Sequence, residues 1–473
     1  MAARTNSEEA STLIALLQKD ISSPSLRSEQ RQATLERLKV IGRNPRDAAP
    51  IFTRDSIEML AKYGFEGNSS PVSWEALRCL ANALYLEPKA RKIFAELGYA
   101  GAAADKLKEQ NSNDEFLVSR ILFLLTYDSG QSFEPLFEEH SLGQSINAHI
   151  ARHSKTYTSQ KTLSPTSSLS SDFDLTALSE SLKLLFNLSN FYPAHVVTFR
   201  PAISSIINIM TNITLPEPAL QAPITYLINA LLNLDLDNLL SPSSELDVLF
   251  PPSNSSTPVD RLISILSLTL TPPTQPDLES LIPLLTLLRK IYQSAPPPTK
   301  QHIKTLLLPS ASDRDLPLGQ TPTLPSRLLR LSTTTSARPL SEAISSLLFD
   351  ISDQNANTFV RNVGYGFAAG FLLSHNIPVP DSARIMQVEN DDDEEEGPGE
   401  ALNPVTGQRL SQEPSADDGA AEMTEEERER EAERLFVLFE RLRATGVVDV
   451  GNPVREAVES GRFESDADQR PPR

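Results

Sequence analysis

A short pattern that occurs three times limits what this chain can fold into more than any other feature. Each copy has an apolar residue, a second apolar residue three positions later, and an asparagine two positions after that. The asparagines are Asn82, Asn187 and Asn233. Apolar residues recur every three or four positions around each copy, which is the period of a helix with one buried face. The pattern therefore predicts armadillo-type repeats, in which each helix buries its neighbour's apolar face.

The three copies do not keep a fixed period, because the separations between successive asparagines are 105 and 46 residues. The units between them must be divergent or carry insertions. We expect residues 1–380 to form an all-α, armadillo/HEAT-like superhelical repeat solenoid. A disordered acidic tail should follow, with a flexible linker over 381–423 and one amphipathic helix within 424–473.

Each asparagine of the pattern has two interpretations. Its side chain can bond a neighbouring turn inside the helix stack, which is a structural role. Alternatively, the asparagines form a ladder on the concave face, where their amides satisfy the backbone of a bound chain. The residues themselves leave both interpretations open.

Charge is unevenly divided between the predicted repeat domain and the tail. Of the net charge of −19, residues 381–473 carry −15, from 26 Asp/Glu and 11 Lys/Arg, which leaves −4 for the first 380 residues. A nearly neutral body lacks the basic footprint of nucleic-acid-binding proteins, so we expect no nucleic-acid partner. The acidic run Asp391–Glu396 either pins the tail to a basic patch or is a solvated spacer.

The expected compartment follows from the cysteine content and the N-terminus. Cys79 is the single cysteine, so no internal disulfide can form. The N-terminal ten residues lack the apolar core of a signal peptide. No run of about 18 apolar residues is present. We therefore expect a reduced, cytoplasmic, monomeric protein without a transmembrane segment.

No residue pattern indicates covalent catalysis. The six histidines and one cysteine are scattered, without metal-ligand spacing. No nucleophile elbow, HExxH or P-loop motif occurs. The spacing of Gly364, Gly366 and Gly370 differs from a dinucleotide fingerprint, and we interpret these glycines as small residues that allow close helix contact. We expect no catalytic residue, no cofactor and no metal.

Three local predictions can be tested directly. Ser73 is expected to cap a helix with the body Ala76–Leu86. The Pro/Thr-rich stretch Leu316–Thr335 is expected to be loosely structured, with one docked turn. The repeat domain should close with the helices Ser341–Asp350 and Asn355–Asn376.

The tail contains one strong helix signal. Thr424 and Glu427 have the spacing of a capping box, and Gly446 follows the expected helix Glu425–Ala444. Its apolar stripe needs a partner surface, which is either the body of the chain or a groove on another protein. The stripe consists of Leu435, Leu438, Phe439 and Leu442.

Five longer stretches carry motifs of one protein family. They are Leu35–Tyr63 with its TRD turn, Ser119–Thr126, Leu182–Ser189, VGYGFAAG in Val363–Gly370, and the tail signature NPVTG…MTEE, which starts at Asn403. These stretches resemble the synembryn family, whose members are cytosolic chaperones and nucleotide exchange factors of heterotrimeric G-protein α subunits (Gα). The first is similar to the family's first repeat and the next two to internal repeats, and the last two are the most specific similarities.

The resemblance implies a function based on binding. Family members hold the C-terminal helix of Gα in a concave armadillo surface, and their own C-terminal helix contacts the Ras-like domain. GDP then leaves, and the nucleotide-free state is held until GTP binds. The same grip serves to chaperone new Gα.

By this resemblance, Lys39 and Arg43 would pair with the Gα C-terminus, and Asn82 would lie on the same surface. The repeat pattern extends the surface to Asn187 and Asn233, with Leu435, Phe439 and Leu442 as a second contact. The structural alternative for Lys39 and Arg43 is two solvated bases at a helix end.

The partner would be GDP-bound or nucleotide-free Gα, and the chain would reach membranes only peripherally, through Gα. The alternative function is an armadillo-type adaptor or transport scaffold that binds a different peptide cargo.

Overall fold

The computed structural model describes residues 6–127, 130–160, 172–236, 250, 257–271, 278–378, 402–403 and 405–412, with side chains omitted at 158–160. The chain divides into two compact units, Met1–Gln408 and Arg409–Arg473. All regular structure in the described residues is helical, without a β-strand, which confirms the predicted all-α class. None of the described helices is both long and apolar enough to cross a membrane.

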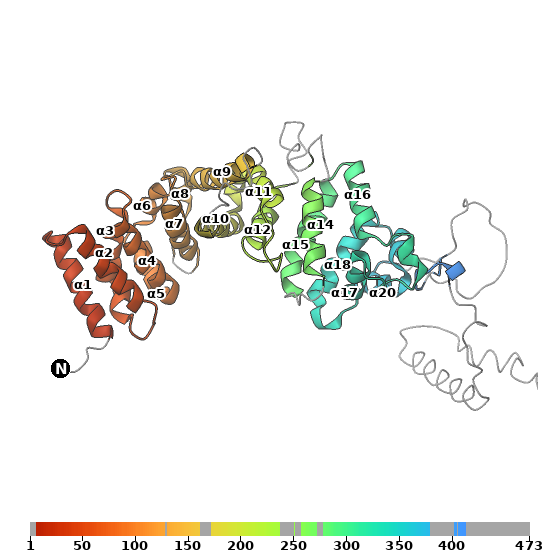
Figure 1. Cartoon of the computed structure of the whole chain (residues 1–473), viewed down its shortest axis with the longest axis horizontal. Helices are drawn as coiled ribbons and strands as arrows, with labels where there is room; N and C mark the ends of the chain where they lie inside the picture. The colour runs from red at the N-terminus through yellow and green to blue at the C-terminus, as the bar shows by residue number, and fades with distance from the viewer. Residues whose placement is uncertain are drawn as a thin grey trace, which may run out of the picture. The chain divides into compact units, whose positions relative to one another are not determined.

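Within the first unit, seven helices form a row in which each packs against the next. The row connects segments far apart in the sequence, as expected for repeats that bury each other's faces (Figure 1). In chain order, the row consists of α2 (Ser28–Ile41), α4 (Pro71–Leu86), α7 (Ser112–Leu125), α10 (Asp172–Phe191), α12 (Ile224–Asn233), α15 (Leu281–Ser294) and α18 (Arg338–Ile351).

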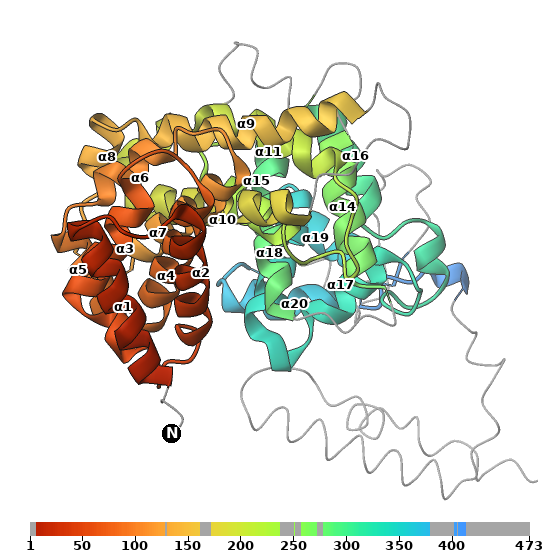
Figure 2. The ribbon, with the colours of Figure 1, turned by 60° about the vertical axis from the view of Figure 1, so that its left-hand side comes forward.

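Other helices flank the row. For example, α3 packs on α4, α6 on α7, and α14 on α15, and α9 runs along α11 (Figure 2). They are α1 (Asn6–Ser22), α3 (Arg54–Phe65), α5 (Pro88–Glu96), α6 (Ala100–Lys106), α8 (Glu134–Glu138), α9 (Leu142–Gln160), α11 (Arg200–Asn212), α14 (Thr257–Thr269), α16 (Pro297–Leu307), α17 (Leu324–Ser332), α19 (Ala356–Val363) and α20 (Tyr365–Ser374). Short 3-10 helices cover Ala49–Phe52, Pro193–Phe199, Leu278–Ser280, Ser312–Asp315, Thr335–Ala337 and Leu410–Gln412.

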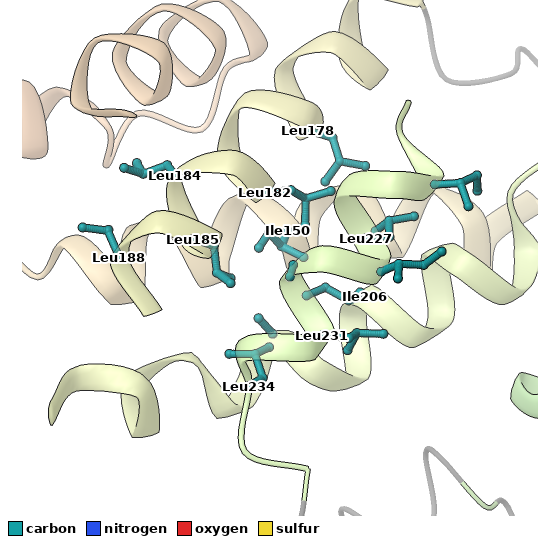
Figure 3. Close-up of a cluster of buried hydrophobic side chains, with 14 of the residues drawn as sticks. Ile150, Leu178, Leu182, Leu184, Leu185, Leu188, Ile206, Leu227, Leu231 and Leu234 are labelled. Carbon is teal, nitrogen blue, oxygen red and sulfur yellow. The ribbon is translucent and has the colours of Figure 1, made fainter. Parts of the chain in front are cut away.

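The apolar stripes of these helices form one continuous core. Figure 3 shows its middle part, where Leu182 and Leu185 of α10 meet Ile150 of α9, Ile206 of α11 and Leu227 of α12. All five side chains are fully buried. Burial of an aliphatic side chain of this size stabilises by about 1.5–3 kcal/mol. The leucines of the repeated pattern are therefore core residues that join neighbouring units.

Helix α4 begins three residues earlier than the sequence predicted. Its cap is Ser70, whose hydroxyl accepts a hydrogen bond from the Ser73 amide at 3.2 Å, while the Ser73 hydroxyl accepts one from the Ser70 amide at 3.0 Å. Pro71 is the first helical residue, a position that suits its missing N–H. The prediction of Ser73 as the cap was wrong because this serine is the third helical residue, which pairs with the Ser70 cap in a capping box.

The closing helices also differ from the prediction. The expected helix Asn355–Asn376 is two helices, α19 and α20, because Gly364 between them has a φ of +79°. The stretch Leu316–Thr335, expected to be loose, contains α17, whose Leu328 and Leu329 are buried.

Part of the predicted linker 381–423 is also seated on the helices. Its residues 405–408 belong to the first unit, where they hydrogen-bond to Arg314, Leu318 and Gly366.

Candidate partner-binding face

Lys39 belongs to a charged network that joins two helices of the row, α2 and α4. The apolar stripe of α2 is buried at Leu35 and Leu38, which leaves Lys39 at the edge of its contact with α4. The Lys39 Nζ lies 2.6 Å from Glu75 Oε2, and the Arg78 guanidinium lies 2.8 Å from Glu75 Oε1. We call Lys39, Glu75 and Arg78 the first triad. One nearly buried carboxylate thus holds two half-buried bases.

Arg43 is placed differently from Lys39. Helix α2 ends at Ile41, so Arg43 lies in the following turn and not on the helix face that carries Lys39. Its side chain is exposed, and among the described residues its guanidinium has no ion-pair or hydrogen-bond partner. The charge of Arg43 is therefore available to a ligand, whereas that of Lys39 is shared with Glu75.

A second triad has the same plan further along the row. Arg120 of α7 donates to Glu180 Oε1 of α10 at 3.1 Å, and Lys183 lies 2.7 Å from Glu180 Oε2. We call Arg120, Glu180 and Lys183 the second triad. In both triads a base on one row helix reaches a buried glutamate on the next, and a second base follows that glutamate by three positions.

Aromatic rings surround the second triad. The guanidinium of Arg120 lies 5.8 Å from the ring centre of Tyr85, and the Lys183 amine lies 5.1 Å from Phe123 and 5.7 Å from Tyr226. These distances are within the range of cation–π attraction. Arg120 and Lys183 are therefore each held by the Glu180 carboxylate and by at least one aromatic ring.

The three asparagines of the repeated pattern have different surroundings. Asn187 is buried and donates to Thr126 Oγ1 at 2.7 Å, and Asn233 donates to the Phe186 carbonyl at 3.2 Å. Both bonds join neighbouring row helices. Asn82 is half-buried, and its amide makes no hydrogen bond to any described residue. Its donors and acceptor are thus available to a bound chain.

A hollow of about 300 Å³ lies between α10 and α12 beside the second triad. Leu175, Pro223 and Tyr226 give it apolar walls, and Ser179, Glu180 and Lys183 give it a polar side. The hollow extends the charged and aromatic face along α10, and its size suits a single side chain.

The two triads carry a sequence signal that the asparagine pattern alone did not reveal. The segments Glu75–Asn82 and Glu180–Asn187 both read Glu-x-Leu-base-x-Leu-x-Asn. Residues spaced by three, four and seven positions share one face of a helix. Extension of the pattern toward the N-terminus would therefore have identified Glu75, Arg78, Glu180 and Lys183.

A buried carboxylate lies beneath the second triad, between α7, α9 and α10. Glu115 is fully buried, and its oxygens accept from Ser181 Oγ at 2.7 Å and contact His153 Nε2 at 2.9 Å. Arg152 also bonds Glu115. Burial alone raises the pKa of this carboxyl, but the hydrogen bond from His153 and the His149 ring, whose Nδ1 lies 3.5 Å from Glu115 Oε2, outweigh that effect and hold its pKa well below the usual range.

The predicted second contact lies outside the described residues. It comprises Leu435, Phe439 and Leu442 of the expected tail helix, so their placement stays a prediction.

Comparison with known proteins gives the family. The model of the family described as guanine nucleotide exchange factor synembryn, Ric8, matches residues 34–462. Chaperone Ric-8A of Xenopus tropicalis is 27% identical over 493 aligned residues, which cover 93% of this chain and 88% of that protein. A synembryn-like chaperone of Schizosaccharomyces pombe is 31% identical over 170 residues, 34% of this chain and 32% of that protein.

Among solved structures, an engineered protein superposes with a TM-score of 0.39 at 17% identity, over 61% of this chain and 98% of its own. The family model, by contrast, matches nearly the whole chain, from the first row helix into the tail. The chain therefore belongs to the synembryn family of guanine nucleotide exchange factors.

Proposed function

We propose that this protein chaperones heterotrimeric G-protein α subunits and promotes their nucleotide exchange by binding the C-terminal helix of Gα. The family and the names of its relatives support the role of chaperone and exchange factor. The observation that carries the proposed site is the availability of Arg43 and Asn82 beside the first triad. We place the Gα C-terminus there.

The chemistry of this face suits a chain that ends in a carboxylate. Arg43 supplies a charge that no described acid neutralises. Lys39, four positions earlier in the chain, is half-buried and paired with Glu75. A guanidinium can bind a carboxylate through two parallel hydrogen bonds. The Asn82 amide can donate to a carbonyl and accept from an N–H of the same bound segment. Charge and amide together would fix the position of the ligand.

Exchange would follow from a difference in affinity. If the protein binds nucleotide-free Gα more tightly than GDP-bound Gα, then by linkage its binding weakens the affinity of Gα for GDP by the same factor. Removal of the Gα C-terminal helix from its own domain would loosen the nucleotide site. The same grip on an unfinished Gα would keep that helix from aggregating, which is the chaperone role. No covalent step is needed.

Asn187 and Asn233 are assigned a supporting role in this proposal. Because their amides bond neighbouring row helices, we expect them to keep α10 and α12 in register. Leu435, Phe439 and Leu442 are proposed as a second contact, on sequence grounds alone. A cytoplasmic location, a monomeric state and peripheral recruitment to membranes through Gα also stay predictions.

The release of labelled GDP from purified Gα tests the proposal directly. We expect the protein to accelerate release and to form a nucleotide-free complex that survives gel filtration and dissociates when GTP is added. The matched control is Gα without the last residues of its C-terminal helix, which should neither bind nor respond. Unchanged release together with no complex would contradict the proposal. Capture of other peptides without Gα would favour a peptide-binding adaptor instead.

A further inference from the structure

A short segment after α20 lies on the helical unit and forms a turn of its own. We call Asn403 and Val405–Gln408 the strap. The Asn403 side-chain oxygen accepts from the amides of Val405 at 2.9 Å and Thr406 at 3.1 Å. The Gly407 amide donates to the Asn403 carbonyl at 2.8 Å, and the Asn403 amide donates to the Gln408 carbonyl at 2.7 Å. The strap therefore has a defined conformation, set largely by its own asparagine and glycine.

Three successive carbonyls of the strap each meet a different donor on the helical unit. The Val405 carbonyl accepts from the Gly366 amide at 3.1 Å, and the Thr406 carbonyl accepts from the Leu318 amide at 3.0 Å. The Gly407 carbonyl accepts from Arg314 Nη1 at 3.0 Å. These donors recognise the backbone of a turn rather than any particular side chain, as in other peptide-binding sites.

Arg314 connects this seat to the end of α19. Its Nη2 donates to the carbonyls of Arg361 at 3.2 Å and Asn362 at 3.0 Å, in the last turn of that helix. A cation satisfies helix-end carbonyls well, because they carry partial negative charge. One guanidinium therefore fixes the helix end and the strap together.

Two glycines shape the contact from opposite sides. Gly364 has a φ of +79°, and a Cβ there would lie 3.0 Å from the Val405 carbonyl oxygen and 3.3 Å from the Gly407 nitrogen. Gly407 has a φ of +67°, and a Cβ there would overlap the Leu318 side chain. Gly370, in contrast, faces open space. The expected role of Gly364, Gly366 and Gly370 in close helix–helix contact was therefore wrong, because the close neighbour of the first two is the strap and the third faces open space.

We propose that the seat formed by Arg314, Leu318, Gly364 and Gly366 is a peptide-binding site, which the chain fills with its own strap and from which the strap can exchange. Its ligand class is a turn-forming peptide in which three successive backbone carbonyls point toward the seat and the third of these residues is a glycine. Exchange is feasible because hydrogen bonds hold the strap, including one from the buried Gln408 side chain to the Asp315 carbonyl at 3.1 Å, while the one large apolar side chain among the described strap residues, Val405, is 39% exposed. Release would remove the three hydrogen bonds that the strap carbonyls accept from the helical unit.

The test uses the full-length chain and a fluorescent peptide with the sequence of residues 400–412. A tethered ligand acts at an effective concentration on the order of mM, so the native strap should exclude the free peptide. In the Gly407→Val variant the chain's own strap cannot occupy the seat. Because the competing tethered strap is then removed, we expect the peptide to bind this variant at least roughly tenfold more tightly than the unmodified chain. A peptide carrying Gly407→Val is the matched control and should not bind.

A second variant identifies the seat itself. Gly407→Val combined with Arg314→Ala should lose peptide binding. Hydrogen exchange supplies an independent readout: the amides of Gly366 and Leu318 should exchange faster in Gly407→Val, while those of α18 stay protected. Equal peptide binding by the unmodified chain and Gly407→Val, undiminished binding by the double variant, or unchanged protection at Gly366 and Leu318 would each overturn the proposal. None of these measurements requires Gα, so the inference and the proposed function can fail separately.

Discussion

The first and second triads have the same plan and spacing but differ in what surrounds them. The first triad lies next to Arg43 and Asn82, whose polar groups have no partner among the described residues. In the second triad, Arg120 and Lys183 lie on aromatic rings. The nearby Asn187 is buried and donates a hydrogen bond to Thr126. One local arrangement thus has two outcomes, depending on its neighbours.

The difference teaches that charge on a row helix does not by itself mark a binding site. A base whose hydrogen bonds and faces are already occupied contributes to cohesion between repeats, whereas an available base can contribute to binding. We therefore expect substitutions around the first triad to change partner affinity and those around the second to change stability. Because repeat arrays unfold unit by unit, stability is best followed by urea titration together with regional hydrogen exchange.

The largest effect is expected at Glu115, beneath the second triad. Glu115→Gln removes the negative charge that Arg152 and His153 face in the core, and breaking such a buried pair costs about 3–5 kcal/mol. Urea titration should show the loss, with faster hydrogen exchange in α7, α9 and α10. Glu58→Gln is the control, since Glu58 forms an exposed pair with Lys62 and should contribute about 0–1 kcal/mol.

The same carboxylate predicts a pH dependence. The pKa of Glu115 in the folded state is lowered from 4.5, so its stabilising contribution is complete above about pH 4.5 and is lost as pH falls toward the folded-state pKa. Glu115→Gln should therefore flatten the stability profile on the acid side. An acid-side slope identical to that of the unmodified chain would contradict the assignment.

The next effect compares the two triads directly. Lys183→Met removes an ion pair and two cation–π contacts, and we expect a loss of about 2–3 kcal/mol. Lys39→Met removes only the pair with Glu75, for about 1–2 kcal/mol. Urea titration of both variants measures the difference. Equal losses would show that the aromatic rings add nothing to the second triad.

Affinity for Gα should depend on Arg43 rather than on the total charge of the chain. Arg43→Glu is expected to weaken binding by about 2 kcal/mol, or roughly thirtyfold, with an unchanged melting temperature. Lys92→Glu makes the same charge change on the exposed surface of the flanking helix α5 and serves as the control. If both variants bind equally well in titration calorimetry, Arg43 is not part of the site.

The smallest effects separate the asparagines. Asn82→Ala should reduce Gα affinity by about 1 kcal/mol and leave stability unchanged, because only a bound chain uses its amide. Asn187→Ala should do the reverse, with a loss of about 1–2 kcal/mol in stability, because the half-buried Thr126 hydroxyl loses its donor. If Asn82→Ala lowered stability and Asn187→Ala lowered Gα affinity, the roles assigned to the two regions would be reversed.

Much of the fold could be predicted from local patterns. The period of apolar residues around Leu182 and Leu185 identified a helix and its buried side, and both leucines are in the core. Helix breaks were harder to predict. The chain from Asn355 to Asn376 was predicted as one helix although it contains Gly364, and the structure shows that Gly364 takes a φ of +79° against the strap, where α19 ends. The start of α4 was missed because Ser70 and Ser73 are both good caps, and only the structure chooses between them.

By itself, the sequence determined that this chain is a series of helices with one apolar face each, since that property depends on residues three and four positions apart. It also determined where the repeated asparagines lie. Only the tertiary structure decided that Asn187 bonds Thr126 while Asn82 bonds no described residue, and that Lys39 faces Glu75 while Arg43 faces no described acid. These distinctions depend on residues that are tens of positions apart in the chain, and the packing of one repeat on the next brings them within hydrogen-bond distance.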